Sequence, residues 1–168
     1  EAASIHDLSA FINEDFKQAI ELIFSCKGRL VITGIGKSAI IAQKIVATLN
    51  STGTPSLFMH AADAIHGDIG MILQEDIVIL ISKSGDSPEI KVLVPIVKSF
   101  GNKIVALVGN TQSFLALQAD AILNTTIKEE ACPNNLAPTT STTAQMVMGD
   151  VLAICLMETK EFNTEDFA

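Results

Sequence analysis

Three serines in one short segment give the sequence its clearest candidate for chemistry. Residues 82–89 also contain a lysine and a glycine, and they end in a proline and a glutamate. Hydroxyl groups and main-chain N–H groups can donate hydrogen bonds to an anion where such a loop enters a helix. A helix cap in front of the proline explains only the last serine, so we interpret the segment as a phosphate site. The residues assigned to it are Ser82, Ser84 and Ser87, with Lys83 beside them.

A second candidate loop is rich in glycine and occupies residues 34–38. Gly36 would let the main chain approach a ligand, while Lys37 and Ser38 would add a positive charge and a hydroxyl group. The spacing differs from that of the nucleoside-triphosphate loop, whose glycines lie further apart, and from the dinucleotide fingerprint, which needs a further glycine. A tight turn between a strand and a helix explains the same residues, and both interpretations stay open.

A third hydroxyl cluster, at residues 139–143, opens the last predicted helix. Thr139 and Thr142 are the members that we assign to phosphate binding. Residues of this kind also cap helices without binding a ligand. Because hydroxyl groups are neutral, the local positive charge would come from Lys37 and Lys83.

The candidates for proton transfer are a histidine and a few glutamates near the ends of predicted strands. They are His66, Glu89 and Glu130, the last preceded by Glu129. A lone histidine is more often structural, and most carboxylates in a chain with 19 Asp and Glu residues lie on the solvated surface. Position after a strand favours these glutamates over the others. No spacing of His, Cys and carboxylate residues indicates a metal site.

Composition limits the class of protein. The 168 residues are 48% hydrophobic and 18% charged, which favours one folded domain and argues against disorder. A formal net charge of −8 without a basic run argues against nucleic acid as a partner, although one phosphate can still bind where positive charge is local. No apolar stretch is long enough for a transmembrane helix. Three widely spaced cysteines fit neither a disulfide framework nor a zinc site, and they favour a reducing cytoplasm.

Apolar patterns predict strands and helices in alternation. Short, continuous apolar runs predict five buried strands, at residues 30–34, 56–59, 76–82, 103–108 and 121–125. Apolar residues three and four positions apart predict helices, at residues 4–26 with Ser4 as the cap, 37–49, 88–100, 112–118 and 139–159. Pro95 should kink or break the helix at 88–100. Residues 126–138 should be irregular.

Strands that are apolar along their whole length need cover on both faces, which is typical of a parallel sheet between layers of helices. We therefore predict an α/β fold, a doubly wound five-stranded parallel sheet flanked by helices, as a single domain over residues 1–168. Ligands of such folds bind outside the carboxyl ends of the strands. The loops that begin at those ends contain the candidate residues above.

Taken together, the loops resemble the SIS (sugar isomerase) domain, which has a flavodoxin-like fold. The motifs are Gly-x-Gly-Lys-Ser (34–38), Ser-Thr-Gly-Thr-Pro-Ser (51–56), His-Gly-Asp-Ile-Gly-Met (66–71) and Ser-x-Ser-Gly-Asp-Ser-x-Glu (82–89). A later segment resembles the D-arabinose-5-phosphate isomerase branch of that family. It reads Glu-Ala-Cys-Pro-x-x-Leu-Ala-Pro-Thr-x-Ser-Thr-Thr (130–143), followed by Met-Gly-Asp (148–150).

The resemblance implies an aldose–ketose isomerase that interconverts D-ribulose 5-phosphate and D-arabinose 5-phosphate, a step towards Kdo for lipopolysaccharide or capsule. The catalytic set that it implies is Lys37, His66, Glu89 and Glu130. The phosphate-binding set is Ser82, Ser84, Ser87, Ser38, Thr139 and Thr142, and substrate contacts are assigned to Gly36 and Lys83. The resemblance implies no redox or nucleotide cofactor, and a homotetramer with active sites near subunit boundaries. The composition and the cysteines favour a cytoplasmic protein. The expected partner is a sugar phosphate, not nucleic acid or a membrane.

The sequence departs from the family pattern at three positions. Lys83 replaces the usual Asn, Asp86 the usual Glu, and Ala39 a common Gly. We expect Lys83 to strengthen anion binding. In the family, a segment that resembles residues 163–168 leads into a His-Pro-Gly-Gly stretch whose His joins the active site, and paired CBS domains often follow. We therefore expect the 168 residues to be a piece of a longer protein.

The implied reaction moves a proton between adjacent carbons through a cis-enediol, so it needs a base and a group that stabilises an oxyanion. We expect either Glu130 or Glu89 to transfer the carbon-bound proton. His66 would act in ring opening or in proton transfer at oxygen, and Lys37 would neutralise developing negative charge. Two alternatives stay open: a sugar-phosphate-binding regulatory module without turnover, and an isomerase of another phosphosugar.

Overall fold

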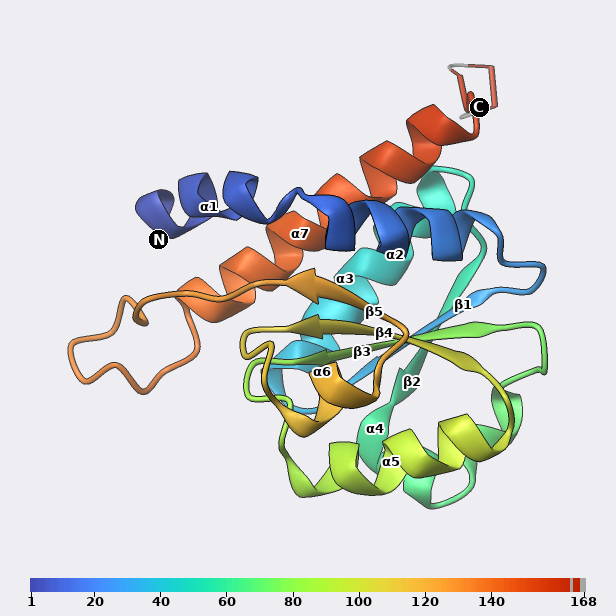
Figure 1. The fold of residues 1–168 in the computed structure, drawn as a ribbon, viewed down its shortest axis with the longest axis horizontal. Coiled ribbons are helices and arrows are strands. Elements are labelled where there is room, and N and C mark those ends of the chain that lie inside the picture. The colour runs from blue at the N-terminus through green and yellow to red at the C-terminus, as the bar shows by residue number, and fades with distance from the viewer. Residues whose placement is uncertain (164, 167–168) are drawn as a thin grey trace.

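Five apolar runs form one parallel sheet, as the sequence predicts. The computed structural model describes residues 1–163 and 165–166. Its sheet has the strand order β2-β1-β3-β4-β5, and each neighbouring pair is parallel (Figure 1). The strands are β1 (Leu30–Gly34), β2 (Ser56–His60), β3 (Ile77–Ser82), β4 (Lys103–Val108) and β5 (Ala121–Asn124). The prediction of a doubly wound α/β fold is confirmed.

Helices cover both faces of the sheet, and β1 and β3 are therefore buried along their whole length. The helices of the first core are α2 (Glu14–Phe24), α3 (Lys37–Ser51) and α7 (Thr140–Thr159). Those of the second core, on the opposite face, are α4 (Ala61–Ile65), α5 (Pro88–Ser99) and α6 (Phe114–Gln118). Successive side chains of a strand point to opposite faces, so β3 contributes Ile79 to the first core and Leu80 to the second.

The amino-terminal helix is interrupted, so the prediction of one helix over residues 4–26 is wrong. The chain forms α1 (Ala2–Asp7), a 3-10 turn (Leu8–Phe11) and then α2. Asn13 has an extended backbone, and its side chain accepts hydrogen bonds from two main-chain N–H groups of the next turn. Asn13 is therefore the cap of α2, a role that the sequence analysis gave to Ser4. The apolar spacing continues through the break because residues on both sides of it reach the first core.

Other helices differ from the prediction in detail. The helix α5 continues through Pro95, and both this residue and Lys91 one turn earlier are exposed, so the carbonyl group that loses its helical partner can face water. The helix α6 begins at Phe114 because Ser113 caps it. The short helix α4 and a 3-10 turn at Asp68–Met71 occupy residues that the sequence analysis left unassigned.

The last helix, α7, is long and apolar, and it belongs to the core. By length and composition it could cross a membrane, but 50% of its most apolar window is buried inside the domain. Its buried face packs on α3, where Gly149 lies against Ile45 and Asp150 pairs with Lys44. The two helices run in the same direction, so their amino-terminal ends lie at the same edge of the sheet (Figure 1).

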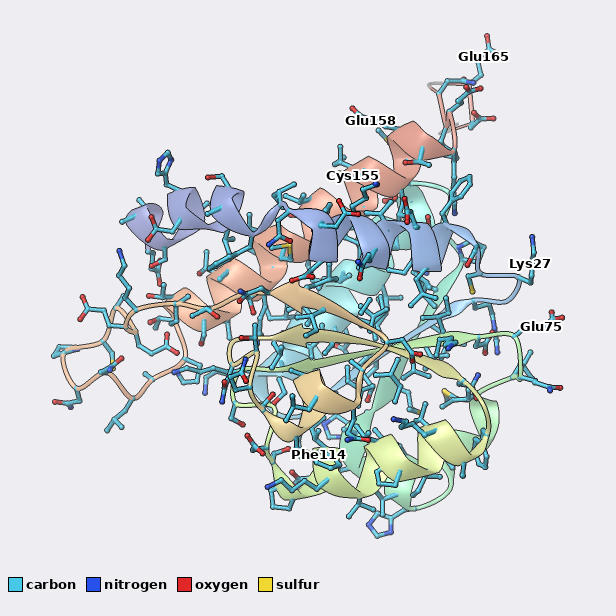
Figure 2. The ribbon with its side chains drawn as sticks, viewed as in Figure 1. Lys27, Glu75, Phe114, Cys155, Glu158 and Glu165 are labelled. Carbon is cyan, nitrogen blue, oxygen red and sulfur yellow. The ribbon has the colours of Figure 1, made fainter. Side chains whose placement is uncertain are left out.

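The carboxyl ends of the strands share that edge. In Figure 1 the arrowheads of β3, β4 and β5 point to the side where α7 begins and where residues 126–139 project from the body. Lys27 and Glu75, labelled in Figure 2, mark the opposite edge. The loops that contain the predicted site residues therefore gather at one edge of the sheet.

Candidate active site

The two candidate loops follow neighbouring strands. Gly34 of β1 is paired with Ile81 of β3, so the glycine-rich loop (residues 34–38) and the serine-rich loop (residues 82–87) begin side by side. The chain then diverges, because α3 packs on the first core and α5 on the second. Positions of this kind, where the winding of a parallel sheet reverses, are where α/β proteins bind ligands.

The serine-rich loop holds its three hydroxyl groups in one pattern. Each Oγ accepts a hydrogen bond from a main-chain N–H later in the loop or in the first turn of α5, at 3.0, 3.3 and 3.5 Å for Ser82, Ser84 and Ser87. A hydroxyl group that accepts in this way keeps its own proton for another partner. Gly85 completes the turn with a φ of +70°, and a Cβ there would overlap Ser113. The loop thus presents three O–H donors at the start of a helix.

The other hydroxyl groups assigned to phosphate use their protons within the protein. Ser38 Oγ donates to Gln145 Oε1 at 3.3 Å, and Thr142 Oγ1 donates to the carbonyl oxygen of Thr139 at 2.9 Å. Thr139 Oγ1 lies within 3.4 Å of two oxygen atoms of its own segment. These three residues therefore offer an anion fewer donors than the serine-rich loop does.

Glu130 is buried where α7 begins. Its Oε2 accepts hydrogen bonds from the main-chain nitrogens of Thr139 at 2.9 Å and Ser141 at 3.0 Å. Its Oε1 accepts from the Ser141 hydroxyl at 2.5 Å and from Lys83 Nζ at 2.7 Å. The N–H groups of a first helical turn have no partner within the helix, so this carboxylate caps α7. The main-chain N–H of Glu130 donates to Asn135 Oδ1 at 2.6 Å and closes the loop around it.

These contacts determine the charge of Glu130. Burial would raise its pKa, but the hydrogen bonds from Lys83, from the Ser141 hydroxyl and from the main chain of Ser141 and Thr139 outweigh burial and lower the pKa to about 2. A carboxylate with so low a pKa is a weak base at neutral pH. In this conformation Glu130 serves as a helix cap and an ion-pair partner.

Lys83 connects the serine-rich loop to the start of α7. Its side chain is 46% exposed, whereas that of its partner Glu130 is fully buried. Asp86, in the same loop, makes different contacts: its Oδ1 lies 3.3 Å from Lys91 Nζ and accepts a hydrogen bond from Phe114 N. Of the two loop residues that depart from the family pattern, only Lys83 therefore contacts a predicted catalytic residue.

The remaining predicted residues lie on three separate elements. Lys37 is the exposed first residue of α3, and Gly36 before it has a φ of +57° with open space where a Cβ would stand. Glu89 is half-buried in the first turn of α5, and His66 is exposed directly after α4, which packs on α5. Within the described part of the chain, no hydrogen bond or ion pair joins these side chains to one another or to Glu130.

The family assignment follows from comparison with known proteins. Residues 23–155 match the SIS domain, a stretch that contains both loops and most of α7. This chain belongs to the SIS domain family.

Curated relatives of this SIS domain match it along its whole length. It is 50% identical over 168 residues to a probable arabinose 5-phosphate isomerase of Haemophilus influenzae. It is 48% identical over 168 residues to the arabinose 5-phosphate isomerase KdsD of Pseudomonas aeruginosa. Both alignments cover 100% of this chain but 50% and 52% of those proteins, so the chain spans about half the length of the curated relatives it matches. The segment 163–168, which resembles the family, lies partly outside the described residues.

Solved structures share the fold of this SIS domain. The Escherichia coli CFT073 protein c3406, in complex with arabinose 5-phosphate, matches with a TM-score of 0.95 and 40% identity over 99% of this chain and 88% of that one. The phosphoheptose isomerase GmhA of Neisseria gonorrhoeae matches with a TM-score of 0.75 over 94% of this chain and 92% of that one. At 18% identity the second comparison concerns the fold alone.

Two polar residues of this SIS domain were not among the predicted site residues. His60 is the last residue of β2 and is paired with Gly34. Its Nδ1 is buried and has no hydrogen-bond partner among the described residues. The distance from this Nδ1 to Asp63 Oδ2 is 3.8 Å. Gln145 is buried on α7, where it accepts the hydrogen bond from Ser38. A histidine at the end of a predicted strand and a glutamine on the apolar face of a helix were the signals that could have found them.

Away from this edge, the described residues do not form a metal site. Among the residues that the structure describes, no three His, Cys, Asp or Glu side chains are grouped to hold a metal ion. A cavity of about 280 Å³ is lined by Cys26, Lys27, Glu75 and Lys103 among others. Two of these residues, Lys27 and Glu75, are labelled at the opposite edge of the sheet in Figure 2. The carboxyl edge is therefore the candidate active site.

Proposed function

We propose that this SIS domain is the catalytic domain of an isomerase that interconverts D-arabinose 5-phosphate and D-ribulose 5-phosphate through a cis-enediol. Relatives named arabinose 5-phosphate isomerase match the whole chain at 46–50% identity, and a structure in complex with arabinose 5-phosphate matches it with a TM-score of 0.95. The observation that carries the proposal is the set of three O–H donors in the serine-rich loop, next to a lysine and close to the glutamate that opens α5.

The serine-rich loop would hold the phosphate. In the described part of the chain, the hydroxyl protons of Ser82, Ser84 and Ser87 have no acceptor, and the positive end of the α5 dipole lies beside them. A hydrogen bond to a charged group contributes about 1.5–3 kcal/mol. Lys83 adds the full positive charge that hydroxyl groups lack. A chain with a net charge of −8 can bind a phosphate in this way because the positive charge is local.

Glu89 is the stronger candidate for the base. The reaction needs a group that takes a proton from one carbon and returns it to the next. Glu89 follows the serine-rich loop directly and makes no ion pair among the described residues, whereas Glu130 is held by Lys83 and by the start of α7. Lys37, exposed at the start of α3, would neutralise the charge that develops on the enediol oxygen. His66 would assist ring opening.

The whole protein would be a cytoplasmic homotetramer that supplies a precursor of Kdo for lipopolysaccharide or capsule. Exposed apolar side chains near the candidate site support self-association: Ile40, in the first turn of α3, is 65% exposed, and Leu136, in the loop after Glu130, is 77% exposed. Free cysteines support a reducing compartment. The proposed reaction uses no redox or nucleotide cofactor.

The test is an isomerase assay with D-ribulose 5-phosphate, D-arabinose 5-phosphate and a panel of other pentose, hexose and heptose phosphates. We expect conversion between the two pentose phosphates, and loss of that conversion in Glu89→Gln but not in Glu129→Gln, which changes an exposed neighbour of Glu130. Turnover of a different phosphosugar alone would reassign the substrate. Binding of phosphosugars without turnover of any would favour a regulatory module.

A further inference from the structure

Lys83 and Glu130 join two segments that border the candidate phosphate site. Lys83 lies between Ser82 and Ser84 in the serine-rich loop, and its Nζ lies 2.7 Å from Glu130 Oε1. Glu130 in turn caps α7. Among the described residues, Lys83 is the one cationic residue that forms an ion pair with this carboxylate.

The two partners differ in their freedom to move. The carboxylate of Glu130 is fully buried and is held at both oxygens by Ser141. The side chain of Lys83 is 46% exposed, and lysine is a flexible chain whose ammonium group has three N–H donors. One of these donors reaches Glu130. An anion that arrives at the neighbouring serines can therefore recruit Lys83, whereas Glu130 has to stay in place.

We propose that Lys83 is a positioning residue shared between Glu130 and the substrate phosphate, so that phosphate binding at the serine-rich loop loosens the ion pair that holds Glu130. The proposal rests on the phosphate site of the proposed function. A phosphate group carries about 1.5–2 negative charges near neutral pH and competes with a carboxylate for a nearby ammonium group.

The consequence concerns when Glu130 can accept a proton. Burial raises the pKa of Glu130, and the hydrogen bond from Lys83 comes first among the contacts that lower it to about 2. When the ammonium group turns to a phosphate, the carboxylate keeps its burial but loses its cation and gains a negative neighbour. Both changes raise its pKa. Glu130 would then have a higher proton affinity while a phosphate is bound than without it.

A double-mutant cycle tests whether Lys83 is shared between Glu130 and the phosphate. The measurement is calorimetric titration with inorganic phosphate at neutral pH. Glu130→Gln releases Lys83, so we expect it to bind phosphate about fivefold to tenfold more tightly than the unmodified chain. In the Lys83→Met background the same change should have little effect, because no shared ammonium group remains. Lys91→Met is the matched control: Lys91 pairs with Asp86 beside the same loop, so it should leave the effect of Glu130→Gln intact.

A second measurement needs no variant that changes the pair. Carbon NMR of the glutamate carboxyl groups, with sulfate as a probe that stays dianionic to a lower pH than phosphate does, should show the pKa of Glu130 rising by about one unit, a tenfold gain in proton affinity. No rise with sulfate bound, or an equal gain from Glu130→Gln with and without Lys83, would overturn the proposal. Neither readout requires turnover, so coupling without isomerase activity would contradict only the proposed function.

Discussion

Ser141 holds both oxygens of the buried Glu130 carboxylate: its hydroxyl lies 2.5 Å from Oε1 and its main-chain nitrogen lies 3.0 Å from Oε2. This two-point contact fixes the orientation of the carboxylate at the positive end of the α7 dipole. Glu130 is therefore part of the framework of the fold as well as of the candidate site. Substitutions there should change stability and activity together.

Replacing Glu130 by glutamine should remove part of the pH dependence of stability. A carboxyl group whose pKa is lowered by folding stabilises the fold above its unfolded pKa, and that contribution is lost as the pH falls through the folded pKa. For Glu130 the window runs from 4.5 down to about 2, and the contribution at neutral pH is about 3 kcal/mol. Denaturant unfolding across acidic pH should show a steeper loss of stability in the unmodified chain than in Glu130→Gln.

In Glu130→Gln, the free energy of unfolding should still fall as the pH is lowered, but less steeply than in the unmodified chain. Asp76 and Asp120 also keep lowered pKa values against the effect of burial, through hydrogen bonds that Glu130→Gln leaves in place. Curves that run parallel in the two proteins would show that Glu130 does not titrate as its contacts predict.

The serine-rich loop and the glycine-rich loop should respond differently to loss of a hydroxyl group. Ser84→Ala removes an O–H donor that has no acceptor among the described residues, so the Kd for inorganic phosphate should rise roughly tenfold or more. Ser38→Ala removes a hydroxyl whose proton is used by Gln145, so the Kd should stay within about twofold. Calorimetry on both variants makes the comparison. Equal losses would mean that Ser38 turns away from Gln145 to bind the anion.

Glu89→Gln should abolish most of the turnover while sparing the fold. Loss of a positioned base lowers kcat by roughly 10²–10⁴-fold. Because Glu89 makes no ion pair in the described part of the chain, the free energy of unfolding should change by less than about 0.5 kcal/mol. Steady-state kinetics and thermal unfolding, with Glu129→Gln as the control, separate the two effects. Near-normal kcat in Glu89→Gln would move the role of base to Glu130.

Gly149→Ala should destabilise the packing between α3 and α7. A Cβ at Gly149 would overlap the side chain of Ile45, which is 1% exposed and cannot move aside freely. Overpacking of this kind costs about 1–3 kcal/mol, measured as the free energy of unfolding. Adding Ile45→Val should recover part of the loss. Gly70→Ala is the control, because nothing lies within 4 Å of a Cβ at that position.

The sheet could be predicted because its strands carry their signal locally. Residues 30–32 and 77–81 are apolar at every position, and short apolar runs of this kind, each followed by a small or polar residue, are typical of strands buried on both faces. The break at Asn13 could not be predicted in this way, because a side-chain cap competed with an apolar spacing that continued through it. At Pro95 a break was predicted but the helix continues, because the turn that loses a hydrogen bond is exposed to water.

For the candidate site, the topology predicted which loops would meet but not what their side chains would do there. Lys83 and Glu130 lie far apart in sequence, and their ion pair depends on how residues 126–139 return to the sheet edge. Whether a hydroxyl group keeps or uses its proton depends on a single neighbour, such as Gln145 for Ser38. Such contacts exist only after the chain has folded.

The two candidate loops lead to helices on opposite faces of the sheet. The glycine-rich loop leads into α3 on one face of the sheet, and the serine-rich loop leads into α5 on the other. A sugar phosphate bound by both loops would link the helical layer of the first core to that of the second core across the sheet edge. Bound ligand would then couple the two layers, so that they unfold as one cooperative unit.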